Sequence, residues 1–127
     1  MNDKRILVLV SLLLCSAAGP LLAGEGSAVM AGHWKLQDDI AGIHKERSCT
    51  FTQTGSAVAG TCRNADGPVS VEGKVTGDKI TLQYKVDFSG QELTIVCTGM
   101  LKSGNGSGTA EAEPLGISGS FTLTRSK

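Results

Sequence analysis

Apolar and polar residues alternate along residues 72–102. When this stretch is folded about Ser89-Gly90, the apolar residues of both halves fall on one face. A period of two is typical of strands that bury one face, and a short glycine-containing turn fixes the register of a hairpin. We therefore predict two central strands that meet at this turn. The predicted pairs on the apolar face are Phe88–Gln91, Val86–Leu93, Tyr84–Ile95, Leu82–Cys97 and Ile80–Gly99.

The same alternation predicts six further strands, which cover residues 33–37, 46–54, 57–63, 69–76, 107–112 and 118–125. Gly55-Ser56 predicts a two-residue hairpin loop. Residues 38–43 contain Asp-Asp and Ala-Gly, and they are interpreted as a loop or one short helical turn.

Eight strands in sequential order allow the last to pair antiparallel with the first. We expect an all-β fold, an eight-stranded antiparallel up-and-down barrel, with a sandwich of two open sheets as the alternative. Such a barrel is filled by side chains or holds one small ligand. Inward glycines, such as Gly60 and Gly119, are expected where strands bend, and they favour a cavity by leaving room.

The first residues are basic, then apolar from Ile6 to Cys15, then small, which predicts a secretory signal peptide over residues 1–23. A lipoprotein signal ending at Cys15 is the alternative. The apolar run is too short for a transmembrane segment, since a helix needs roughly 20 such residues. We expect a flexible lead-in over residues 24–31, then one barrel domain over residues 32–127, exported to the periplasm or the extracellular space.

Export to an oxidising compartment makes the cysteines informative. With Gly55-Ser56 as the loop, Cys49 lies opposite Cys62 in a pair where side chains are closest, so a disulfide is predicted there. Cys97 is interpreted as a buried thiol beside Leu82, with pairing to another chain or a reactive thiol as the alternatives.

Charge and motifs indicate little chemistry. The chain has 12 Lys and Arg and 12 Asp and Glu, with no basic stripe, so no nucleic-acid partner is expected. No nucleophile lies beside a base, and no carboxylate pair faces inward, so we expect neither an enzyme nor a cofactor. His33 and His44 with the neighbouring aspartates are interpreted as a solvated loop in preference to a metal site.

The predicted inner face is almost uncharged, and Tyr84 is its only clear polar group. It comprises Trp34, Leu36, Phe51, Val58, Val71, Val75, Ile80, Leu82, Tyr84, Val86, Leu93, Ile95, Phe121 and Leu123. An ordinary filled core is one interpretation of this set, and a mainly apolar pocket at the barrel mouth is the other. For the pocket, the candidate ligand-binding residues are Trp34, Phe51, Leu82, Tyr84, Ile95 and Phe121.

Gly32-His33-Trp34, then Phe51 and Val58-Ala59-Gly60-Thr61, resemble the Gly-x-Trp opening and first hairpin of lipocalin-like and avidin-like barrels. Residues 72–80, 97–99 and 119–122 are similar to small exported bacterial proteins of that shape. The avidin-like barrels bind biotin through many tryptophans, and this chain has one. The opening also resembles periplasmic metalloprotease inhibitors, which act through a free N-terminal segment.

We therefore expect an exported, non-catalytic barrel that binds a small apolar ligand. The alternatives are a protease inhibitor acting through residues 24–29 and a structural envelope protein.

Overall fold

The computed structural model describes residues 28–126, which form eight strands. The predicted signal peptide and residues 24–27 of the lead-in lie outside the described residues. The strands are β1 (Gly32–Ile40), β2 (Ile43–Thr54), β3 (Ala57–Asn64), β4 (Gly67–Thr76), β5 (Lys79–Phe88), β6 (Gln91–Lys102), β7 (Asn105–Glu113) and β8 (Ile117–Arg125). Residues 28–126 include no helix of the length and hydropathy needed to cross a membrane.

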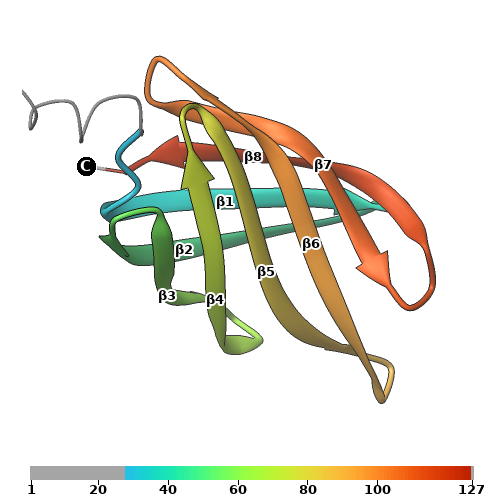
Figure 1. The fold of residues 1–127 in the computed structure, drawn as a ribbon. Coiled ribbons are helices and arrows are strands. Elements are labelled where there is room, and N and C mark those ends of the chain that lie inside the picture. The colour runs from blue at the N-terminus through green and yellow to red at the C-terminus, as the bar shows by residue number, and fades with distance from the viewer. Residues whose placement is uncertain (1–27, 127) are drawn as a thin grey trace, which may run out of the picture.

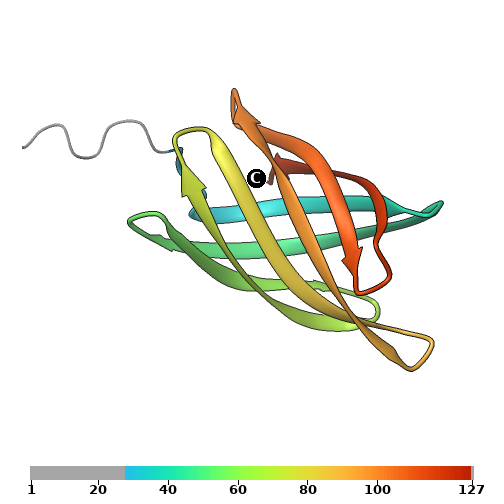
Figure 2. The same cartoon turned by 45° about the vertical axis from the view of Figure 1, so that its right-hand side comes forward.

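The strands form a closed antiparallel barrel in sequential order. Each strand pairs with the next, and β1 closes the sheet by pairing with β8 from Trp34–Arg125 to Ile40–Gly119. Figures 1 and 2 show β1 lying between β2 and β8. The expected barrel is confirmed, and closure leaves no unpaired sheet edge.

The predicted hairpin registers are confirmed. In the central pair Phe88 faces Gln91, Tyr84 faces Ile95 and Leu82 faces Cys97, as the turn at Ser89-Gly90 requires. Both turn residues have positive φ, 52° at Ser89 and 84° at Gly90, which matches the twist of two-residue hairpins.

The predicted disulfide is also present. Cys49 and Cys62 face each other across β2 and β3 and are bonded, with a sequence separation of 13. A crosslink closing a loop of this length stabilises a fold by about 3 kcal/mol. A disulfide of this kind is typical of an oxidising environment.

One core fills the barrel. Every residue of the predicted apolar inner face is buried except Val86, which is half-buried against the others. Met30 and Leu101 also belong to this core, as do Ala110 and Ala112 of β7 and the three cysteines Cys49, Cys62 and Cys97.

The first strand is longer than predicted, and the loop expected over residues 38–43 is wrong. β1 continues to Ile40, and the turn is formed by Ala41 and Gly42, which have φ of 54° and 81°. Asp38 and Asp39 stay in the strand because both β2 and β8 pair with them, so tertiary pairing overrides their low strand propensity. Asp38 consequently faces inward and is only 5 % exposed.

The inward glycines do not leave room for a cavity, and that expectation is wrong. A Cβ atom at Gly60 would lie 2.1 Å from the carbonyl oxygen of Thr50, and one at Gly119 would lie 2.0 Å from that of Asp39. These glycines let adjacent strands approach one another closely, which a strongly coiled small barrel requires.

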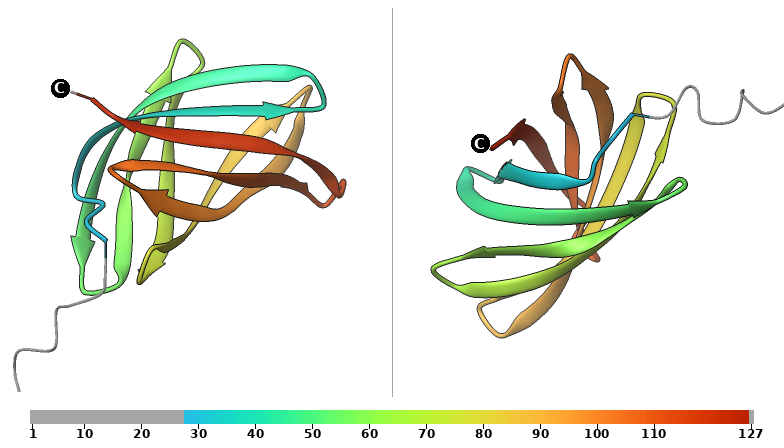
Figure 3. Two further views of the ribbon diagram at one scale, coloured as in Figure 1. Left: turned by 90° about the horizontal axis from the view of Figure 1, so that it is seen from above. Right: turned by 90° about the vertical axis from the view of Figure 1, so that its left-hand side faces the viewer.

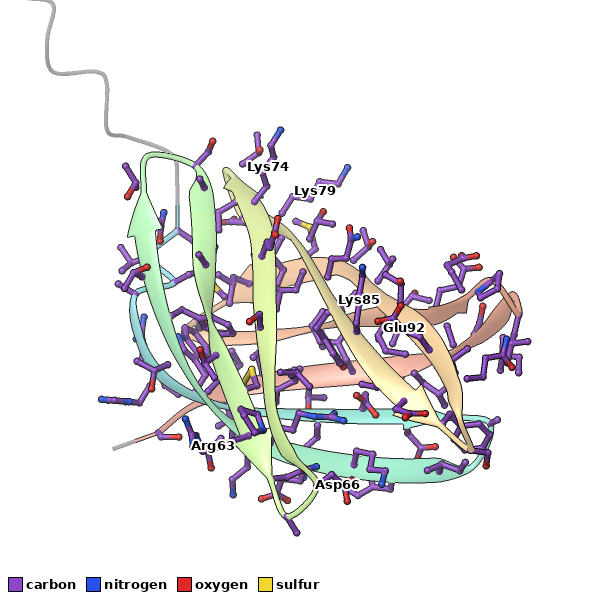
Figure 4. All side chains as sticks on the ribbon, turned by 90° about the horizontal axis from the view of Figure 1, so that it is seen from below. Arg63, Asp66, Lys74, Lys79, Lys85 and Glu92 are labelled. Atoms are coloured by element: carbon purple, nitrogen blue, oxygen red, sulfur yellow. A yellow bond between two sulfur atoms is a disulfide. The ribbon has the colours of Figure 1, made fainter. Side chains whose placement is uncertain are left out.

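The two ends of the barrel differ. The turns β1–β2, β3–β4, β5–β6 and β7–β8 share one end, which we call the mouth (Figure 3). The other three turns lie at the opposite end, together with residues 28 and 126. Figure 4 shows this separation, with Asp66 at the mouth and Lys74 and Lys79 at the opposite end.

The described part of the lead-in, Ala28 to Ala31, lies across the end opposite the mouth. The backbone N–H of Ala28 donates to Gly77 O (2.9 Å), and Arg125 donates to the carbonyls of Val29 and Ala31 (2.9 and 2.8 Å). Met30 is fully buried there, and its carbonyl accepts a hydrogen bond from Trp34 Nε1 at 2.8 Å. The segment therefore closes this end.

Candidate functional site

The mouth holds a cavity of about 900 Å³. This volume lies within the range usual for small-molecule sites, about 300–1,000 Å³. Part of its wall is apolar and continues the core outward through Val69, Val86, Leu93 and Ile95, and the rest of the lining is polar or charged. The cavity is therefore the open end of the same interior that the core fills lower down.

Exposed apolar side chains form part of the rim of the cavity, beside charged ones. They are Ile43, Phe88, Leu115 and Ile117, which are 42, 47, 46 and 36 % exposed and come from three of the mouth hairpins. Exposed apolar residues scattered singly are normal, whereas large contiguous apolar patches are typical of interaction surfaces and ligand-binding grooves. The rim and wall together would favour entry of an apolar molecule.

The cavity floor carries a buried ion pair. Arg47 on β2 and Asp38 on β1 both line the cavity, and each side chain is only 6 % exposed. Nη1 of Arg47 donates to Asp38 Oδ2 at 3.2 Å, and the guanidinium carbon lies 5.4 Å from the centre of the Tyr84 ring. The expectation that Tyr84 is the only polar group on the inner face is therefore wrong.

Tyr84 joins this pair to the core below. Its hydroxyl donates to Asp38 Oδ2 at 2.5 Å, so one carboxylate oxygen accepts from both neighbours. Burial raises the pKa of Tyr84 well above its ordinary value, and the neighbouring Cys97 and Asp38 raise it further. Tyr84 thus stays protonated and acts as a donor.

Cys97 is a free, buried thiol at the same level of the barrel, as predicted. Burial raises the pKa of Cys97 to about 12, although a hydrogen bond with Tyr84 lowers it in part. A thiol in this state is a poor nucleophile at neutral pH. Cys97 contributes packing to the floor of the site.

The six residues predicted to bind ligand fall into two groups. Ile95 lines the cavity, and Tyr84 lies directly beneath it through Asp38. Trp34, Phe51, Leu82 and Phe121 are buried in the core and do not line the cavity. Their role in binding stays a prediction.

Sequence reasoning missed Asp38 and Arg47, although a signal was present. The two-residue period that runs through Trp34 and Leu36 reaches Asp38, and the period through Phe51 and Cys49 reaches Arg47. Opposite charges at inward positions of paired strands would have indicated a buried pair.

The rest of residues 28–126 offers no comparable site. A hollow of about 540 Å³ lies on the outer face of β6, β7 and β8, between exposed side chains such as Met100, Lys102 and Thr124. Among residues 28–126, no group of three or more His, Cys, Asp or Glu side chains is placed to hold a metal ion. The mouth is therefore the candidate site.

The fold and the cavity together define a small closed antiparallel barrel with one open end. Comparison with models of known families and with curated proteins found no match to this chain.

Proposed function

We propose that this protein is an exported, non-catalytic barrel that binds a small, mainly apolar molecule in the mouth cavity. The observation that carries this proposal is the cavity of about 900 Å³, whose wall continues the apolar core and whose rim includes exposed apolar side chains among charged ones. The opposite end is closed by Met30, so a ligand would enter and leave through the mouth. Periplasmic or extracellular export is part of the proposal, and the disulfide supports it.

Val86→Phe tests the site directly. Val86 lines the cavity and is half-buried, so a larger side chain there should fill volume that a ligand needs. We expect the uncharged fluorescent probe N-phenyl-1-naphthylamine to bind the native protein at a single saturable site. Val86→Phe should weaken this binding at least about tenfold, or ~1.4 kcal/mol.

Val96→Phe is the matched control. It makes the same valine-to-phenylalanine change, but Val96 lies on the outer face of the neighbouring strand β6, away from the cavity. Fatty acids, fatty alcohols and isoprenoids that bind should also raise the melting temperature of the native protein. Two results together would refute the proposal. One is probe binding that does not saturate or that the two variants weaken equally, and the other is a melting temperature that no ligand raises.

Protease inhibition through a free N-terminal segment has less support. Ala28 and Met30 are held to the barrel through Gln53 and Gly77, and Met30 is part of the core. The side chain of Val29 in this segment is 65 % exposed, whereas that of Met30 is fully buried. Ligand binding at the mouth therefore remains the function that the geometry favours.

A further inference from the structure

The polar residues at the floor of the mouth cavity indicate which chemical groups a ligand would have. This inference rests on the proposed function, that the cavity is a binding site. Arg47 lines the cavity yet is almost fully buried, so its guanidinium has little access to water. Burying a donor without a partner is costly, and it is more so when the group is charged. The hydrogen bonds that Arg47 lacks therefore indicate what a ligand would supply.

Arg47 has more donors than the described residues satisfy. A guanidinium has five N–H groups, and among side chains of residues 28–126 only Asp38 accepts from it, through Nη1. Nε of Arg47 is, within the same residues, the one fully buried side-chain nitrogen or oxygen with no hydrogen-bond partner, and its burial closes it to the cavity. The donors that a ligand in the cavity could reach are therefore the Nη N–H groups that do not bond to Asp38. The hydroxyl of Tyr84 does not accept a hydrogen bond from Arg47 and is itself a donor to Asp38. The floor therefore has an excess of donors and needs an acceptor.

The charge of the floor is nevertheless balanced. Asp38 already neutralises Arg47, and Lys45 at the rim pairs with Asp66 at 3.1 Å. The charged residues that line the cavity are three basic and four acidic: Lys45, Arg47 and Lys85, against Asp38, Asp66, Asp87 and Glu92. A carboxylate at the floor would be a buried charge without a counterion, and the carboxylate of Asp38 would repel it.

We propose that the ligand is a neutral amphiphile, whose apolar body occupies the cavity and whose alcohol, ester or ketone oxygen accepts a hydrogen bond from Arg47. The Asp38–Arg47 pair then acts as a specificity determinant: Arg47 recognises an acceptor oxygen, and Asp38 excludes an anionic one. The apolar wall contributes affinity without distinguishing head groups.

A series of ten-carbon ligands tests this specificity in the native protein. Decane, 1-decanol, methyl decanoate and decanoate would each displace N-phenyl-1-naphthylamine, at concentrations below those at which they aggregate. We expect the alcohol and the ester to displace the probe at concentrations about tenfold lower than decane, which is the gain from one hydrogen bond to a charged donor. Decanoate should be the weakest of the oxygen-containing ligands.

Asp38→Asn should reverse this order. Asparagine keeps an acceptor for Tyr84 but leaves the charge of Arg47 without a partner, which a bound carboxylate would neutralise. Decanoate affinity should rise at least about tenfold and exceed that of decanol, and decanoate should raise the melting temperature of this variant most. In the double variant Asp38→Asn/Arg47→Met, decane and decanol should displace the probe at equal concentrations, because the group that distinguishes them is gone.

The outcomes separate the two proposals. If neither the probe nor any ligand binds the native protein, the proposed function fails. If the probe and decane bind but decanol has no advantage, or decanoate binds the native protein as well as decanol does, the neutral-acceptor inference fails while ligand binding stands. Should Asp38→Asn not fold, the series in the native protein decides the question alone.

Discussion

At the scale of single residues, the main feature is a set of buried polar side chains that share one acceptor. Asp38 Oδ2 accepts from both Arg47 and Tyr84, and Cys97 lies close enough to Tyr84 for each to affect the other's pKa. Buried ion pairs do not reliably stabilise a fold, but removing one partner is strongly destabilising. The retention of this costly group at the floor of an open cavity is consistent with a role in recognition.

Cys97 gives a test of this environment. Burial raises the pKa of its thiol from 9.0 to about 12, so the folded state favours the protonated form. The resulting stability is fully present below about pH 9 and is lost as the pH rises toward about 12. Between about pH 9 and 11, the free energy of unfolding of the native protein should fall by up to ~1.4 kcal/mol per pH unit more than that of Cys97→Ala.

Urea unfolding at a series of pH values measures this difference, since the other titrating groups are common to both proteins. Cys97→Ala also removes the part of the Tyr84 pKa shift that Cys97 causes, but burial, the largest cause of that shift, remains. The thiol should also resist a disulfide reagent near neutral pH until the protein is denatured. Parallel pH profiles for the two proteins, or rapid labelling of the folded protein, would contradict the assigned burial.

These residues show where sequence reasoning stops. The apolar residues facing inward could be predicted because burial and alternation agree for them. Arg47 and Asp38 were missed although the alternation reaches them, because charged side chains are almost never buried unless paired, and their pairing depends on a diagonal contact between β1 and β2. The alternation predicts that Tyr84 faces inward, but its hydrogen-bond partner Asp38 lies in the segment interpreted as a loop.

At the scale of strands and turns, local signals predicted most of the structure. Ser89-Gly90 and Gly55-Ser56 each fixed a register that extends over the whole hairpin. The first strand was underestimated because Asp38 and Asp39 have low strand propensity, while the closure of the barrel provides them with partners on both sides. Pairing between distant strands is not visible in a local pattern.

Gly119→Ala tests how closely the strands approach. An added Cβ would lie 2.0 Å from Asp39 O and 2.7 Å from the Cα of Ile40, and backbone atoms of a paired strand cannot easily move away. We expect the free energy of unfolding to fall by about 1–3 kcal/mol, as for other overpacked sites. Urea denaturation would measure this loss.

Ser118→Ala is the control, because Ser118 precedes Gly119 in β8 and is exposed. Its effect should stay within about 0.5 kcal/mol. Equal stabilities for the two variants would show that β1 and β8 are farther apart than the structure places them.

At the scale of the whole molecule, one interior is open at one end and closed at the other. The closed end depends on Met30 and on Arg125, whose guanidinium stacks 4.3 Å from the centre of the Trp34 ring and also donates to the backbone of the lead-in. The sequence gives no periodic signal for this closure, because residues 28–31 precede the first strand and act through one side chain and several backbone groups.

Met30→Ala should therefore be costly. Removing a fully buried side chain of this size lowers stability by about 2–5 kcal/mol. Val29→Ala is the matched control on the adjacent residue, which is 65 % exposed, and its effect should be below about 0.5 kcal/mol. Thermal and urea unfolding would measure both, and similar losses for the two variants would contradict the closing role of Met30.

The placement of residues 28 and 126 has a practical consequence. Both lie at the closed end, where Ala28 is bonded to Gly77 and Ser126 to His33, so a linker joined there would extend away from the four loops around the entrance. Immobilising the protein on a sensor surface through its C-terminus should present that entrance to the solution, with the loops free for randomisation in the selection of new binding specificities.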